Sequence, residues 1–103
     1  MVKIAFFVPE DHKEVVKSAM FAAGAGGIGN YDQCCWEVEG MGQFRALEGA
    51  DPFLGVMGNI ERVKEFKVEM VCADGVVKSV VQALKQAHPY EEPAYDVVVL
   101  LDI

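Results

Sequence analysis

Residues 87–96, "AHPYEEPAYD", hold one imidazole and two carboxylates close together, at His88, Glu91 and Glu92. Such a group can bind a divalent metal ion or pair a general acid with a general base. The two prolines oppose this use, because extended backbone sends neighbouring side chains in different directions. The alternative is a rigid connector, with His88 close to the end of a helix and both glutamates in solvent. The sequence favours the connector and leaves these three residues as candidate metal ligands.

Residues 24–29, "GAGGIG", have the G-x-G-x-x-G spacing of dinucleotide-binding loops. In such loops a strand leads into the glycines and a helix starts from them, so that the pyrophosphate meets free backbone N–H groups. Here the order is reversed, because a predicted helix precedes the glycines and a strand follows them. We therefore predict that the glycines supply positive-φ conformations at a helix C-terminus. A loop that binds a partner or a small anion through its backbone is the remaining alternative.

A binding face for a partner or small ligand is predicted from residues 24–31 together with residues 88–93. Its candidate residues are Gly24, Gly26, Gly27, Gly29, Asn30, Tyr31, His88, Tyr90 and Glu91. No serine or cysteine nucleophile stands at a recognisable spacing from either of the two histidines, so no catalytic residue is predicted. The sequence thus favours a binding protein over an enzyme.

Hydrophobic periodicity predicts the elements that must position these residues. Period-two patterns predict strands at 2–8 and 60–73, and helical stripes predict helices at 10–24 and 76–88. Alternation at 34–47 with glycines at 40 and 42 predicts a β-hairpin. The continuous apolar run at 95–103 predicts a buried final strand, and the glycine-rich stretch 48–59 predicts a loop. Together they predict one ferredoxin-like α+β domain over residues 1–103, an antiparallel sheet with two helices on one face and an extra β-hairpin.

The composition limits the class of partner. The chain has 103 residues, 52% of them hydrophobic, which suffices for one core. Its net charge of -7 opposes binding to nucleic acid or to an anionic membrane surface. The apolar run before Pro9 is too short for a signal sequence, so a cytoplasmic location is expected. The three cysteines lack C-x-x-C spacing and are expected to be reduced.

Four segments in order carry a family resemblance: "GAGGIGNYDQCCW", "GQFRALEGADPFLG", "ERVKEFKVEMV" and "AHPYEEPAYDV". They resemble the inserted PII-like domain of the Nif-three-like dimetal-binding protein family, over essentially the whole chain. The last segment is also similar to the His-Pro-Tyr-Glu-x-Pro stretch of the CutA proteins. The resemblance implies a PII/CutA-like fold and a homo-oligomer, with a trimer favoured over a dimer. On the CutA side it also implies divalent-metal binding, with His88 as the matching imidazole.

The same resemblance limits what is expected of this chain. In that family the metal ligands come from segments that flank the insert, so neither the dimetal site nor a hydrolase activity is expected here. Nucleotide binding of the PII kind is not expected either, because residues 48–59 contain no lysine or arginine. We predict an oligomeric module that binds a partner or small ligand. The alternative is a divalent-metal-binding or metal-dependent protein that uses His88 and the nearby carboxylates.

Self-association also follows from the strand patterns. Helices on one face leave the other face of the sheet for water or another subunit. Lys67 and Glu69 predict that part of this face is solvated. An apolar patch is expected beside them, formed by Phe7, Val71, Val98 and Leu100.

Overall fold

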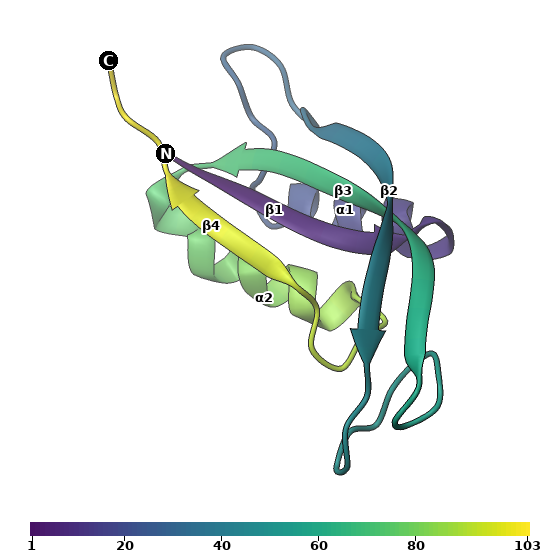
Figure 1. Cartoon of the computed structure of the whole chain (residues 1–103). Coiled ribbons are helices and arrows are strands. Elements are labelled where there is room, and N and C mark those ends of the chain that lie inside the picture. Colours follow the sequence, from purple (N-terminus) through teal and green to yellow (C-terminus); the bar gives the residue numbers. More distant parts are fainter.

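The computed structural model describes residues 1–103 as four strands and two α-helices. The order is β1 (Val2–Pro9), α1 (Glu10–Ala22), β2 (Trp36–Arg45), β3 (Ile60–Cys72), a 3₁₀ turn (Asp74–Val76), α2 (Val77–Ala87) and β4 (Tyr95–Val99). The strands form one antiparallel sheet in the order β2-β3-β1-β4, and both helices lie against the same face of it (Figure 1). The predicted α+β sandwich is confirmed. Neither helix has the length and apolar character needed to span a bilayer.

The core lies between the sheet and the helices. Alternate residues of β1 and β3 point inward, as the period-two pattern predicts, and meet the inner faces of α1 and α2. The buried cluster consists of Val2, Ile4, Phe6, Val8, Val16, Met20, Ala25, Val68, Met70, Cys72, Val80 and Leu84. The opposite face of the sheet has no helix on it, and we call it the open face.

The prediction of an extra β-hairpin at 34–47 is wrong. Strand β2 continues through this segment, with Gly40 opposite Glu65 and Gly42 opposite Val63 in β3. Neither glycine has a positive φ, so neither makes a turn. A Cβ at Gly42 would overlap the Glu65 carboxylate, which shows that this glycine makes room for a side chain from the neighbouring strand. β2 and β3 therefore form one long hairpin, joined by residues 46–59, that projects beyond the rest of the sheet (Figure 1).

The predicted burial of the last strand is also wrong. β4 lies at the edge of the sheet, so no strand covers its outer side. Val97 and Val98 are 38% and 50% exposed, and Val99 is 81% exposed. An apolar run does not tell a central strand from an edge strand, because the sheet order depends on distant parts of the chain.

The first residue lies beside the end of the last strand. The Leu100 N–H donates to the Met1 carbonyl oxygen at 3.0 Å, and Val2 pairs with Val99. The chain therefore enters and leaves the sheet on adjacent strands.

Candidate functional site

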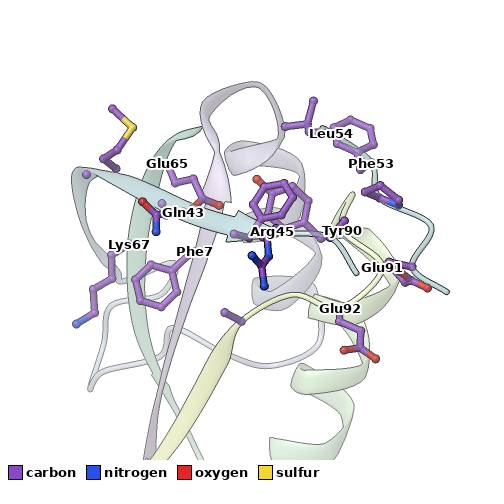
Figure 2. A pocket seen from close by; sticks show the side chains of 18 of the residues that line it. Phe7, Gln43, Arg45, Phe53, Leu54, Glu65, Lys67, Tyr90, Glu91 and Glu92 are labelled. Atoms are coloured by element: carbon purple, nitrogen blue, oxygen red, sulfur yellow. The ribbon is translucent and has the colours of Figure 1, made fainter. Parts of the chain in front are cut away.

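A cavity of about 690 Å³ opens on the open face of the sheet. Five segments line it: Phe7 of β1, residues 38–45 of β2, the adjoining part of β3, the 46–59 loop and the connector from Tyr90 onward (Figure 2). We call it the open-face pocket. Its apolar lining includes Phe7, Val38, Met41, Phe44, Leu47, Phe53, Leu54 and Tyr90, and its charged lining consists of Glu39, Arg45, Glu65, Lys67, Glu91 and Glu92.

Hydrogen bonds hold the loop and the connector in place around the pocket. The Gly58 N–H donates to the carbonyl oxygen of buried Ala46 at 2.8 Å, which closes the 46–59 loop at its base. The Asp51 N–H donates to the Glu91 carboxylate at 3.1 Å, which joins this loop to the connector. Segments forty residues apart in the sequence thus form one wall of the pocket.

An aromatic cluster runs along this wall. The ring of Tyr90 lies 6.3 Å from that of Phe44 and 6.3 Å from that of Phe53, measured between centroids. His12 packs edge-on against Phe53 at 5.3 Å, and His88 lies 4.8 Å from Tyr90. Such offset and tilted geometries are the favoured arrangements of aromatic pairs. The cluster therefore gives the pocket a firm apolar surface.

His88 fastens the connector to the sheet. Its side chain is buried, at 6% exposure, and its two ring nitrogens have different partners. The Tyr90 N–H donates to Nδ1 at 3.1 Å, so Nε2 carries the proton and donates to the Phe7 carbonyl oxygen at 2.7 Å. Burial lowers the pKa of His88, and nearby His12 lowers it further, which favours the neutral ring. His88 is thus a structural link between two residues that line the pocket, Phe7 and Tyr90.

Tyr90 places a polar atom in an apolar setting. Its hydroxyl oxygen is buried and makes no hydrogen bond within normal geometry. Burial raises the pKa of Tyr90, and the negative charge of the Glu65 carboxylate raises it further. The hydroxyl therefore stays protonated and lies close to the Glu65 carboxylate, outside normal hydrogen-bond geometry.

We expect Tyr90→Phe to leave the free energy of unfolding unchanged or to raise it by up to ~1 kcal/mol, because it removes a buried polar atom that has no partner. Urea denaturation of both proteins at pH 7 measures this difference. A loss above ~1 kcal/mol would show that the hydroxyl makes a bond in solution.

The three candidate metal ligands do not converge. Both ring nitrogens of His88 have partners, Glu91 accepts a backbone N–H, and Glu92 is exposed. No group of three or more His, Cys, Asp or Glu side chains is arranged to hold a metal ion. Metal binding by these residues stays a prediction. Zinc or copper bound stoichiometrically to untagged protein, and lost in a folded His88→Ala variant, would support it.

The glycine-rich loop ends α1 with a hydrogen-bonded motif. The Ala25 N–H donates to Met20 O at 3.1 Å and the Gly24 N–H to Phe21 O at 3.0 Å, which is the Schellman pattern. Gly24, Gly26 and Gly29 have φ values of +116°, +87° and +57°. The predicted conformational role holds for these three glycines, whereas Gly27 has an ordinary φ. Beyond them, Asn30 and Tyr31 are exposed at the tip of the loop.

The structure does not bring the two predicted binding segments together. The Gly26 N–H donates to Val71 O, and Val71 pairs with Lys3 near the start of β1. His88 is bonded to Phe7, four residues further along the same strand, a separation of ~13 Å. The 24–31 loop and the 88–93 connector therefore lie at opposite ends of the sheet.

Of the sequence candidates, Tyr90, Glu91 and Glu92 line the open-face pocket. Sequence reasoning missed most of its other lining, including Phe44, Phe53 and Glu65. One local signal was present, because Phe53 and Leu54 are large apolar residues within a loop otherwise rich in glycine. The pairing of Gly42 with β3, which brings it beside the Glu65 carboxylate, had no local signal.

Comparison with known proteins places the chain among relatives of greater length. No protein-family model matches it. It is 46% identical over 99 residues to the GTP cyclohydrolase 1 type 2 homolog of Mycobacterium tuberculosis, covering 96% of this chain and 26% of the relative. The crystal structure of a Bacillus cereus protein related to NIF3 matches with a TM-score of 0.84 and 42% identity, over 98% of this chain and 26% of the other.

CutA1 from Pyrococcus horikoshii matches all of this chain and 86% of its own, with a TM-score of 0.68 and 20% identity, which shows a shared fold. The chain spans about a quarter of the length of the curated relatives it matches. It is homologous to the inserted region of the GTP cyclohydrolase 1 type 2 and NIF3-related proteins, and it has the CutA/PII-like fold. Both resemblances expected from the sequence motifs are confirmed.

Proposed function

From this homology to the inserted region of NIF3-related proteins, we propose that the chain is a self-associating module that binds a small ligand or a segment of a partner in the open-face pocket. The observation that carries the proposal is the pocket itself. It is a cavity of about 690 Å³ whose walls come from five separate segments. Concave sites of this size, mainly apolar and with a few polar groups, are typical of ligand-binding pockets.

The arrangement of the walls supports binding. The aromatic cluster offers apolar area, and the bonds made by His88 and Glu91 hold its segments in one geometry. A wall that is already ordered loses little conformational entropy when a ligand arrives. Charged groups stand at intervals around the apolar area and can orient a ligand.

An NMR titration tests the pocket. Benzyl alcohol, a small neutral aromatic compound, is added to ¹⁵N-labelled protein, and we expect the largest amide shifts at Gly40, Gly42 and Tyr90. Phe53→Ala should weaken these shifts, whereas Met57→Ala should not. Phe53 and Met57 have similar exposures of 50% and 55% in the same loop, but only Phe53 lines the pocket. Shifts spread over the whole surface, or equal effects of both variants, would contradict the proposal.

Self-association is supported by the open face and the sheet edges. On this face Trp36, Val38 and Val98 are 64%, 43% and 50% exposed, while Lys67 and Glu69 make an ion pair beside them at 3.5 Å. β2 and β4 also leave their outer backbone groups unpaired at the two edges of the sheet. Such edges favour pairing with a second chain. A second copy would cover both the apolar side chains and the edges.

We expect light scattering to give a mass of about 34 kDa for a trimer of the 11.3 kDa chain, with a dimer of about 23 kDa as the second choice. Val98→Glu should shift the mass toward the monomer, because it places a charge within the apolar part of the interface. Val15→Glu is the control, since Val15 is 62% exposed on α1, away from the open face. A stable monomer in the unmodified protein would refute self-association.

A further inference from the structure

The open-face pocket also indicates the chemistry of its ligand, provided that it is the binding site proposed above. We propose that it takes an organic cation, a protonated or quaternary amine carried on an apolar body. Two independent features point to this class: the aromatic rings of the pocket and the balance of its charges.

The rings of Phe44, Phe53 and Tyr90 lie on one wall, with neighbouring centroids 6.3 Å apart. The face of an aromatic ring carries partial negative charge and attracts an ammonium group. Rings grouped at this spacing can also contact the apolar body of the ligand. An amine on a hydrocarbon body matches both properties.

The unpaired charges of the pocket are mainly negative. Its six charged residues comprise four glutamates, one arginine and one lysine. Lys67 is paired with Glu69 at 3.5 Å, and Glu39 is paired with Lys64 at 3.3 Å. Four charged groups of the pocket have no ion pair (Figure 2). Three are the carboxylates of Glu65, Glu91 and Glu92, and the fourth is the guanidinium of Arg45. The net charge of -7 on the chain adds to the attraction for a cation.

Glu65 is the central anionic group. It is half-buried, makes no ion pair, and lies where a side chain at position 42 would otherwise stand. Its charge also raises the pKa of the neighbouring Tyr90. A partly buried carboxylate without a cationic partner is unfavourable, and an ammonium group in the pocket would supply that partner. Figure 2 shows Glu65, Tyr90 and Arg45 around the middle of the pocket, with Glu91 and Glu92 further out.

The test compares three probes of similar size by NMR titration: benzyltrimethylammonium, benzyl alcohol and phenylacetate. At low ionic strength we expect the cation to bind at least about fivefold more tightly than the alcohol, and phenylacetate to bind most weakly. Glu65→Gln should remove most of this preference. Arg45→Gln should strengthen binding of the cation about twofold, because it removes the opposing charge.

Glu61→Gln is the matched control. Glu61 is half-buried on the same strand, makes no ion pair, and does not line the pocket. Equal binding of the cation and the alcohol, or tighter binding of phenylacetate, would overturn the ligand class and leave the pocket as a binding site. An equal loss in Glu61→Gln and Glu65→Gln would overturn the role of Glu65. No shift at the pocket amides with any probe would refute the pocket itself.

Discussion

Replacing Gly26 with alanine is expected to lower the free energy of unfolding by ~3 kcal/mol, the largest effect of any glycine in the chain. Gly26 has a φ of +87°, which costs an L-residue ~1–2 kcal/mol. A Cβ there would lie 2.7 Å from the Phe21 ring and 3.1 Å from the Cys34 nitrogen, and overpacking of this kind costs a further ~1–3 kcal/mol. The backbone cannot shift easily, because two hydrogen bonds of 2.8 Å hold it. The Gly26 N–H donates to the Val71 carbonyl oxygen, and the Gly26 carbonyl oxygen accepts from the Cys34 N–H.

Gly27→Ala is the control for this prediction. Gly27 is exposed, has an ordinary φ, and leaves open space within 4 Å of the point where a Cβ would lie. We expect its substitution to change the free energy of unfolding by less than ~0.5 kcal/mol. Urea denaturation with a constant m-value measures both variants. Similar stability for the two would show that the loop relaxes around Gly26.

His88→Ala is expected to lower the free energy of unfolding by ~3 kcal/mol. It leaves the Phe7 carbonyl and the Tyr90 N–H without their partners. It also opens a cavity, because the His88 side chain that it removes is only 6% exposed. His12→Ala is the comparison, because His12 packs on Phe53 while its Nδ1 makes no hydrogen bond. Its loss should be smaller by at least ~1 kcal/mol. Equal losses would show that packing, not the two hydrogen bonds, accounts for the effect.

His88 also predicts how stability depends on pH. Its pKa is lowered in the folded protein, chiefly by burial, relative to the unfolded value near 6.5. Below pH ~7 the imidazole therefore takes up a proton more readily in the unfolded chain than in the folded protein. The contribution of neutral His88 to the free energy of unfolding is fully present above the unfolded pKa and is lost as the pH falls toward the folded pKa. We expect the urea concentration at the midpoint of denaturation to decrease as the pH is lowered from 7.5 to 5, and to decrease less in His88→Gln. The same slope in both proteins would assign the effect to other groups.

Much of the fold could be predicted because it depends on local patterns. Ile4, Phe6 and Val8 alternate with outward residues in β1, and Val80 and Leu84 recur at helical spacing in α2. These periods place side chains on one face whatever the rest of the chain does. The errors arose where distant segments decide. Gly40 and Gly42 have the chemistry of a turn, but pairing with β3 keeps them extended.

The site was less predictable for the same reason. Tyr90 and Glu91 stood out because they lie in a dense cluster of polar and aromatic residues. Phe44 and Glu65 lie twenty-one positions apart and face one pocket only through the register of β2 and β3. His88 has a residue type that binds metal ions, and its burial and its two hydrogen bonds depend on Phe7 and Tyr90, which only the folded chain brings to it.

The hydrogen bond between Met1 and Leu100 affects how easily this fold can be inserted into a loop of another protein. Two consecutive residues of a host loop would need to separate only by the distance between paired strands, ~5 Å, to accommodate the whole fold. The host could keep its own core and register, since the guest returns the chain to the point where it left. The matching region occupies 26% of its relatives, in keeping with such a cassette. A recombination event could therefore add or remove it without redesign of the surrounding protein.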